Sequence, residues 1–362
     1  MSSKNLFGSI HGFLEEAAVT ENDKSIKENM DDICETLEEE IIKSDMDNDT
    51  KKDLLKKLRK FGATKTNIML VGATGCGKSS TINALFGLGE SDNEYVEVAK
   101  VGTKADPETK DIEKYSIGKL VLWDTPGLGD GTEIDEHHKE VIKELLQDKD
   151  ENGDALIDLI LVILDGSTKD LATSYKLLNE VIIPELGDET GRILVALNQA
   201  DIAMKTGRHW DYENNEPDET LLNYLDEKLV SIKSRIKEDS GLDVEPLYYC
   251  AGYKEESGDV VYPYNLSKLL FCILSALPSH KRVPIMESVN TNSDSYEYND
   301  DDMDYGDAVK ESFMETFEDF ISDGVDTGAD IGGIILGFPG AVVGAFIGGA
   351  IGCIRSILDD IF

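Results

Sequence analysis

The sequence predicts an α/β fold in which a mostly parallel sheet is covered by helices, with helical flanks at both ends of the chain. Between residues 67 and 280, short apolar runs alternate with amphipathic stretches, which is typical of strands buried between helices. A hydrophobic content of 40% in 362 residues can form a sizeable core. The five runs read as strands are "NIMLVG", "KLVLWD", "LILVIL", "RILVALN" and "PLYYC".

The first 61 residues are expected to form an N-terminal helical region. Three stripes of apolar side chains recur there at the three- and four-residue spacing of one helix face. The stripes are Leu6, Ile10, Phe13, Leu14 and Ala17, then Ile26, Met30, Ile33, Leu37 and Ile41, then Leu54, Leu55, Leu58 and Phe61.

A glycine-rich loop follows the first strand-like run. The stretch "VGATGCGKSS" at residues 71–80 fits the pattern G-x-x-x-x-G-K-[ST] and precedes a helix-like segment, "SSTINALFG". Such a loop wraps phosphate groups with backbone N–H groups at a helix N-terminus. The lysine would neutralise the outer phosphates, and the first serine hydroxyl would bind Mg²⁺. The residues expected to contact phosphate are Gly75, Cys76, Gly77, Lys78, Ser79 and Ser80.

Two further motifs follow strand-like runs. In "KLVLWDTPGLGDG", Asp124 can hold the metal through water, and the Gly127 N–H can sense the terminal phosphate. In "LVALNQAD", Asn198 ends the fourth apolar run and Asp201 follows it.

The order of these motifs resembles that of P-loop GTPases. Over about residues 55–280 the chain resembles the Era-like branch of the translation-factor class, and within it the bacterial YeeP/YfjP-type GTPases. The resemblance implies GTP and GDP as ligands. It also implies that Asp201 accepts two hydrogen bonds from guanine, and that the Ala251 N–H in "LYYCAGY" meets the guanine carbonyl. Gln199 stands where the family has a lysine beside the base, which predicts weaker binding with guanine preference retained.

The resemblance also implies a threonine that reaches Mg²⁺ when the third phosphate is present. Thr109 is our choice, because it lies just before an expected edge strand at 111–117, and Thr103 is the alternative. The candidate catalytic residues are therefore Lys78, Thr109 and Gly127, and the candidate metal ligands are Ser79, Thr109 and Asp124.

Hydrolysis is expected to be slow in the isolated chain. Many GTPases carry a glutamine after the Asp-x-x-Gly element to orient water, whereas this chain has Leu128. Relatives with an apolar residue there resemble enzymes that dimerisation or a partner accelerates, so a homodimer through the GTPase domain is an expected assembly. His137 and His138 are candidates for positioning water, with plain helix or loop residues as the alternative.

The C-terminal third contains two segments of unlike composition. After a GTPase domain expected over residues 62–283, residues 284–307 are polar and acidic and are expected to be a disordered linker. Residues 308–362 are expected to form an amphipathic helix and a glycine-rich apolar hairpin. The uncharged run 331–354 could insert reversibly into a membrane, pack in a soluble helical domain, or form a single span.

The charge of the chain limits its partners. A formal net charge of −38 repels nucleic acid and anionic headgroups, so no nucleic-acid partner is expected. Five cysteines without a C-x-x-C pair, and no secretory signal pattern, predict a cytoplasmic protein, with peripheral membrane contact as an alternative. The leading hypothesis is a GTP-hydrolysing switch that controls the helical flanks and the tail. The alternatives are a GTP-binding membrane or assembly module with negligible turnover, and a ribosome-associated GTPase.

Overall fold

The computed structural model describes most of the chain. The described residues are 30–91, 94–96, 112–127, 132–207, 209–254, 260–323, 354, 357–359 and 361–362. The chain divides into two compact units. The larger comprises Lys65–Ser312 with Ile361–Phe362, and the smaller comprises Met1–Thr64 with Phe313–Asp360.

The larger unit is built on a six-stranded sheet, in the order β10-β7-β6-β1-β5-β4. All neighbouring pairs are parallel except β4 and β5, which are antiparallel. The predicted α/β fold with a mostly parallel sheet is therefore confirmed. The strands are β1 (Thr66–Gly72), β4 (Glu113–Ile117), β5 (Leu120–Asp124), β6 (Leu159–Asp165), β7 (Ile193–Asn198) and β10 (Leu247–Tyr248).

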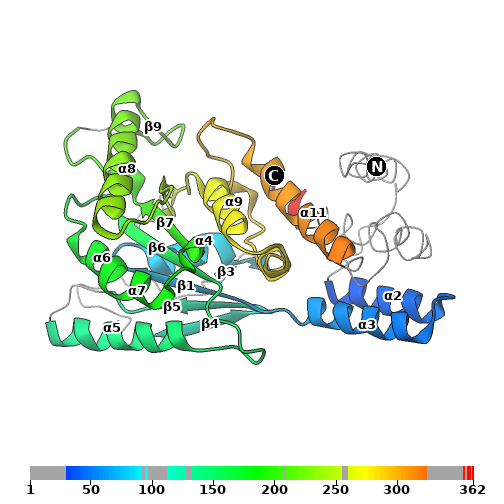
Figure 1. Cartoon of the computed structure of the whole chain (residues 1–362). Helices are drawn as coiled ribbons and strands as arrows, with labels where there is room; N and C mark the ends of the chain where they lie inside the picture. Colours follow the sequence, from blue (N-terminus) through cyan, green and yellow to red (C-terminus); the bar gives the residue numbers. More distant parts are fainter. Residues whose placement is uncertain are drawn as a thin grey trace, which may run out of the picture. The chain divides into compact units, whose positions relative to one another are not determined.

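Helices pack on both faces of this sheet (Figure 1). The central strands are buried on both sides, which is why they read as continuous apolar runs rather than alternating ones. Met69 and Val71 of β1 join the core formed with α5 and α8, together with the helical run from Ala172 to Leu186. The helices of the larger unit are α4 (Lys78–Phe86), α5 (Thr132–Gln147), α6 (Ala172–Leu177), α7 (Ile183–Leu186), α8 (Glu219–Ser240), α9 (Leu266–Ala276), α10 (Val283–Met286) and the part of α11 (Tyr305–Asp323) up to Ser312.

Short elements complete the larger unit. Three two-stranded ribbons are β2 (Leu88–Ser91) with β3 (Glu94–Val96), β8 (Trp210–Asp211) with β9 (Glu216–Pro217), and β11 (Tyr253–Lys254) with β12 (Val260–Val261). Single turns of helix are η1 (Leu178–Ile182), η2 (Thr190–Arg192), η3 (Ala200–Ile202), η4 (Ser279–Lys281) and η5 (Ser293–Ser295).

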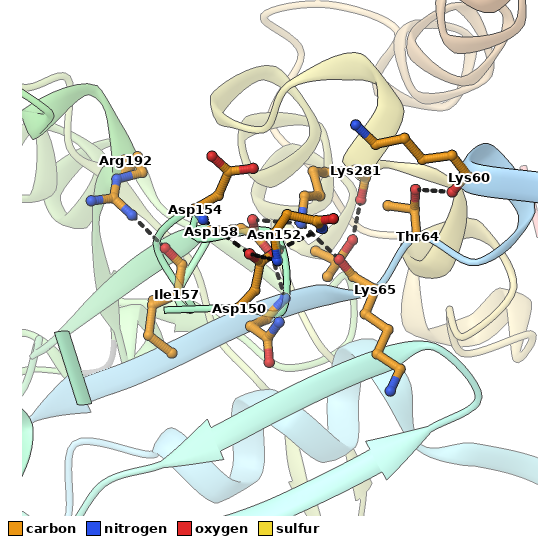
Figure 2. A network of polar contacts seen from close by, with 12 residues as sticks. Lys60, Thr64, Lys65, Asp150, Asn152, Asp154, Ile157, Asp158, Arg192 and Lys281 are labelled. Atoms are coloured by element: carbon orange, nitrogen blue, oxygen red, sulfur yellow. Dashed lines mark hydrogen bonds and ion pairs between the residues drawn. The ribbon is translucent and has the colours of Figure 1, made fainter. Parts of the chain in front are cut away.

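A polar network anchors the N-terminal end of β1 (Figure 2). One carboxylate oxygen of Asp158, Oδ2, accepts from the Asn67 N–H at 2.8 Å, and the other, Oδ1, pairs with Lys281 Nζ at 2.9 Å. Lys281 Nζ also donates to the Lys65 carbonyl at 2.9 Å. Because Asp158 directly precedes β6, this carboxylate ties the starts of β1 and β6 together. Both strands then run to the edge of the sheet where the glycine-rich loop begins.

The smaller unit contains α2 (Met30–Lys43), α3 (Asn48–Gly62) and the part of α11 from Phe313 onward. Ile33, Leu37 and Ile41 of the predicted second stripe are buried, as are Leu58 and Phe61 of the third. The Phe61 ring lies 6.3 Å from that of Phe317 and 4.5 Å from that of Phe320, between ring centroids. The first predicted stripe lies outside the described residues.

The expectation of a disordered linker at 284–307 is wrong. Ile285, Met286, Val289 and Tyr296 are buried, and the segment belongs to the larger unit, which extends to Ser312 rather than ending at residue 283. Its polar side chains also have partners. Asn290 caps the C-terminal end of α4, because its N–H donates to the Leu85 carbonyl at 2.7 Å and its Nδ2 to the Ala84 carbonyl at 3.0 Å.

Acidic residues of the same segment are paired as well. Asp300 Oδ2 accepts from Lys268 Nζ at 2.7 Å and from Asn265 Nδ2 at 2.9 Å, and the Tyr305 hydroxyl donates to Asp300 Oδ1 at 2.8 Å. A composition rich in acidic and polar residues suggested disorder, but a few apolar anchors and specific partners order this segment. The run 331–354 of the predicted hairpin lies outside the described residues except for Ile354. No helix among the described residues is long and apolar enough to span a bilayer.

Candidate functional site

The site lies where parallel strands end. The C-terminal ends of β1, β5, β6, β7 and β10 meet at one edge of the sheet, since all five strands run in the same direction. Crevices at this edge are the usual ligand sites of open α/β sheets. The three sequence motifs directly follow β1, β5 and β7, so the fold brings them to this edge.

The glycine-rich loop connects β1 to α4. Gly75 and Gly77 have φ of +79° and +92°, a region that residues with a side chain rarely adopt. A Cβ on Gly77 would also lie 2.2 Å from Asn198 Nδ2, so the Asn198 side chain would have to move to admit any other residue. This geometry presents the N-terminal end of α4 to a ligand, and unpaired N–H groups at a helix N-terminus favour anions.

Lys78 is the first residue of α4 and is buried. Its Nζ lies 3.4 Å from the Gly72 carbonyl and 3.3 Å from the Ala73 carbonyl, both beyond the usual range for N–H···O hydrogen bonds. The ammonium group is therefore held at the start of the loop by long contacts. Ser79 and Ser80 follow in the first turn, both partly exposed.

Asp124 and Ser79 meet beside the loop. The Ser79 hydroxyl donates to Asp124 Oδ2 at 2.7 Å, while Asp124 Oδ1 is buried and has no partner among the described residues. Burial raises the pKa of Asp124, although the Lys78 charge and the Ser79 hydrogen bond oppose that shift. A hydroxyl and a carboxylate with a spare buried oxygen form a donor set that suits Mg²⁺, which keeps several water or phosphate ligands.

Gly127 lies against Thr74 of the phosphate loop. A Cβ on this residue would lie 2.4 Å from Thr74 Cα and 2.5 Å from Thr74 N, so the Asp-Thr-Pro-Gly turn and the loop touch through backbone atoms. Thr103, Thr109 and Leu128, which were singled out in the sequence, lie outside the described residues. The structure thus brings Asp124 and Gly127 to the phosphate loop, and the choice between Thr103 and Thr109 stays a prediction.

Asn198 links the phosphate loop to the segment after β10. Its Nδ2 donates to the Cys76 carbonyl at 3.0 Å, and its Oδ1 accepts from the Ala251 N–H at 3.1 Å. Gln199, at φ +62°, donates through Nε2 to the Gly75 carbonyl at 2.8 Å. The glutamine therefore makes a direct hydrogen bond to the phosphate loop from the position where the family pattern has lysine.

Asp201 is a buried carboxylate in the following turn. Its Oδ1 accepts from the Cys250 thiol at 3.3 Å, and its Oδ2 has no partner among the described residues. Burial raises the pKa of Asp201. Burial and the nearby carboxylate raise the pKa of the Cys250 thiol well above its ordinary value, which keeps the thiol protonated and able to donate.

Sequence reasoning missed the turn after β6. Gly166 donates its N–H to the Asn198 carbonyl at 2.8 Å, and a Cβ there would lie 2.4 Å from that oxygen. The Lys228 ammonium of α8 donates to the Gly166 carbonyl and, at 2.7 Å, to the Thr168 carbonyl. In the sequence, this turn is marked only by the stretch "DGS" at residues 165–167, at the end of a strand-like run.

The two histidines of α5 differ in their surroundings. His137 is exposed, whereas His138 is buried with its Nδ1 unpartnered among the described residues. Neither has a hydrogen bond to the nucleotide motifs in the part of the chain that the structure describes. Their proposed part in positioning water has no support in this geometry.

The fold and the three converging motifs define a P-loop GTPase domain. Residues 67–199 match the model of a family described as 50S ribosome-binding GTPase. Residues 67–199 thus belong to a P-loop GTPase domain, and the match covers a little over a third of the chain.

The curated relatives that match part of this chain are named as GTPases. The chain is 44% identical over 66 residues to interferon-gamma-inducible GTPase 10 of Mus musculus, covering 17% of this chain and 15% of the relative. It is 35% identical over 79 residues to interferon-inducible GTPase 5 of Bos taurus, covering 22% of this chain and 17% of the relative. The matches therefore span about a sixth of the length of these relatives.

Among solved structures, Toc33 from Arabidopsis thaliana with GDP and Mg²⁺ has a TM-score of 0.36 at 18% identity, over 68% of this chain and 96% of Toc33. The bacterial dynamin GTPase LeoA from ETEC has a TM-score of 0.37 at 12% identity, over 83% of this chain and 48% of LeoA.

Proposed function

We propose that this chain binds GTP with Mg²⁺, hydrolyses it to GDP and phosphate, and acts as a nucleotide-controlled switch. The observation that carries the proposal is a pair of buried carboxylates, Asp124 and Asp201, each with one oxygen that lacks a partner among the described residues. A buried unpaired carboxylate is costly unless a ligand completes it. One stands beside the phosphate loop and the other beside the segment that holds Ala251.

At the phosphate end, the backbone N–H groups from Gly75 to Ser80 would bind the phosphates, with Lys78 neutralising the outer ones. Ser79 and Asp124 are the residues that would hold Mg²⁺, Ser79 by its hydroxyl and Asp124 through water. The bound metal would neutralise charge on the phosphates. The Gly127 N–H would contact the third phosphate, and Thr109, or alternatively Thr103, would join the metal only while that phosphate is present.

At the base end, Asp201 would accept hydrogen bonds from the guanine N1–H and amino group. Adenine lacks both donors and would leave the carboxylate unpaired, at a cost of roughly 1–3 kcal/mol or more. The Ala251 N–H already donates to Asn198 Oδ1, so contact with the guanine carbonyl would share or replace that bond. Gln199 would help by holding the phosphate loop through Gly75.

Turnover by the isolated chain is expected to be slow, and dimerisation or another partner would accelerate it. Leu128 supports this part of the proposal, because an apolar side chain cannot orient the attacking water. The same residue favours a second candidate, a GTP-binding membrane or assembly module with negligible turnover. The resemblance to Era-like GTPases is also part of this proposal. It suggests a ribosome-associated role as a further alternative.

The output of the switch would be the helical flanks and the glycine-rich run 331–354. The proposal is that GTP exposes this run for reversible membrane contact or self-assembly in the cytoplasm. The supporting features are its lack of charged residues and its glycines at every fourth position, Gly340, Gly344, Gly348 and Gly352, which permit close helix packing.

The test is titration of the full chain with fluorescent GDP and Mg²⁺, using Lys78→Ala as the variant. The variant should lose tight binding, because the ammonium group that balances the outer phosphates is gone. Lys52→Ala is a matched control, since Lys52 is exposed on α3 in the smaller unit. Equal affinity of Lys78→Ala and wild type would refute the proposed site.

A further inference from the structure

Tyr249 is a fully buried tyrosine that lies between the nucleotide motifs. It follows β10 and directly precedes Cys250 and Ala251 of the base-binding segment. Its N–H donates to the Leu197 carbonyl at 2.9 Å, and its carbonyl accepts from the Ala200 N–H at 3.2 Å. The backbone of Tyr249 therefore makes hydrogen bonds to the residues on either side of the Asn198-Gln199 turn, Leu197 and Ala200.

The Tyr249 side chain reaches a different motif. Its hydroxyl lies 2.6 Å from Thr81 Oγ1 in the first turns of α4, and Thr81 Oγ1 lies 2.7 Å from the Gly77 carbonyl. A carbonyl can only accept, so the single Thr81 proton goes to Gly77 and Tyr249 must donate to Thr81. Burial raises the pKa of Tyr249 well above its ordinary value, so the phenol keeps the proton that it donates.

The chain of hydrogen bonds that starts at the Tyr249 hydroxyl ends at Gly77, whose backbone conformation is constrained. Gly77 directly precedes α4 as its N-cap residue, at φ +92°, and a Cβ there would lie 2.2 Å from Asn198 Nδ2. The neighbouring Cys76 carbonyl accepts from Asn198 Nδ2. Asn198 thus holds the phosphate loop at Cys76, and Thr81 with Tyr249 holds it at Gly77.

We propose that Tyr249 is a positioning residue for nucleotide binding, which uses its hydroxyl to fix the phosphate loop from the base-binding segment through Thr81 and Gly77. The inference rests on the proposed binding of guanine nucleotides. Hydrogen bonds in a buried chain polarise one another, so the terminal hydroxyl strengthens the Thr81 contact with Gly77. The phosphate N–H groups are then held in place before the ligand arrives.

The alternative is a tyrosine that only fills the core. Tyr249→Phe separates the two roles, because it keeps the ring and removes only the hydroxyl. A positioning role predicts that GDP binds about five- to tenfold more weakly. It also predicts that the ratio of affinities for GDP and IDP stays within about twofold of wild type, because IDP differs only at the base. A core-filling role predicts unchanged affinity for both nucleotides.

Thr81 supplies the second arm of the experiment. Thr81→Val should weaken GDP binding to a similar extent, Thr81→Ser should retain it, and the Tyr249→Phe/Thr81→Val double variant should lose little more than either single variant. Tyr248→Phe is the matched control, because it removes a phenol one residue away that has no hydrogen bond to α4 among the described residues. If Tyr249→Phe fails to fold, the Thr81 variants carry the test alone.

The outcomes separate this inference from the proposed function. If the wild-type chain binds no GDP, the proposed function fails. If the wild type binds GDP and both Tyr249→Phe and Thr81→Val bind it equally well, the positioning role is refuted while the function stands. A Tyr249→Phe variant that loses discrimination between GDP and IDP would also refute it, because the hydroxyl would then act on the base segment alone.

Discussion

Replacing Asp201 by asparagine should weaken guanine binding and stabilise the nucleotide-free chain. Asp201 Oδ1 accepts a hydrogen bond from the Cys250 thiol at 3.3 Å, and Oδ2 has no partner among the described residues. A hydrogen bond to a charged group contributes about 1.5–3 kcal/mol. Losing such a bond to guanine, and facing its N–H groups with an amide N–H, should cost about 3 kcal/mol, or roughly 100-fold in affinity.

Xanthine nucleotides should respond in the opposite direction. Xanthine carries a carbonyl where guanine has its amino group, so the side-chain amide of the Asp201→Asn variant could donate to it. Competition between GDP and XDP for the variant would measure the change in preference. A variant that keeps the wild-type affinity and preference for GDP would refute the base-reading role of Asp201.

Although Asp201→Asn should weaken guanine binding, it should increase the stability of the nucleotide-free chain. Since burial raises the pKa of Asp201, removing its charge should stabilise the fold by about 1–3 kcal/mol at neutral pH. For a unit of this size that corresponds to roughly 2–4 °C in Tm per kcal/mol. Asp188→Asn removes the same charge from an exposed position and should change neither affinity nor Tm. A lower Tm for Asp201→Asn than for Asp188→Asn would contradict the cost assigned to the unpaired carboxylate.

Three other outcomes follow. Gly127→Ala would place a Cβ against the Thr74 backbone, so titration should show nucleotide binding at least about tenfold weaker, and unchanged binding would contradict the close packing. Because burial raises the pKa of Asp124, its contribution to stability is fully present below its unfolded pKa and is lost as pH rises through its folded pKa. The nucleotide-free Tm of Asp124→Asn should therefore exceed that of wild type by a margin that grows as the pH rises above the ordinary pKa of an aspartate, whereas a constant difference would argue against a buried charge. In liposome flotation, the full chain should float with a non-hydrolysable GTP analogue but not with GDP, and flotation under neither condition would direct the search for an output to protein partners.

The sheet was predictable because its strands are buried on both faces. Runs such as residues 68–72 and 159–164 have no polar interruption, and helices cover both sides of them in the larger unit. The spacing of the phosphate-loop motif also predicted its place, since the motif requires a strand before it and a helix after it. In both cases the pattern and the structure that it forms are adjacent in the sequence.

The contacts that were missed join residues far apart in the sequence. Tyr249 reaches Thr81 across 168 positions, and Asn290 caps α4 across 206 positions, without any local pattern that marks either one. Composition made residues 284–307 look disordered because the few apolar anchors are outnumbered by acidic side chains. Their partners, such as Lys268 for Asp300, become visible only once the chain is folded.

The most direct test of the central claim is phosphate release from GTP by the full chain, with ATP as the control nucleotide and Lys78→Ala as the control variant. The account predicts release from GTP alone, loss of that release in Lys78→Ala, and a specific activity that rises with protein concentration if dimerisation completes the site. Equal release from ATP, or equal release by Lys78→Ala, would contradict the proposed GTPase. Tight GTP binding without any release at all protein concentrations would leave the chain as a GTP-binding module and refute its proposed enzymatic activity.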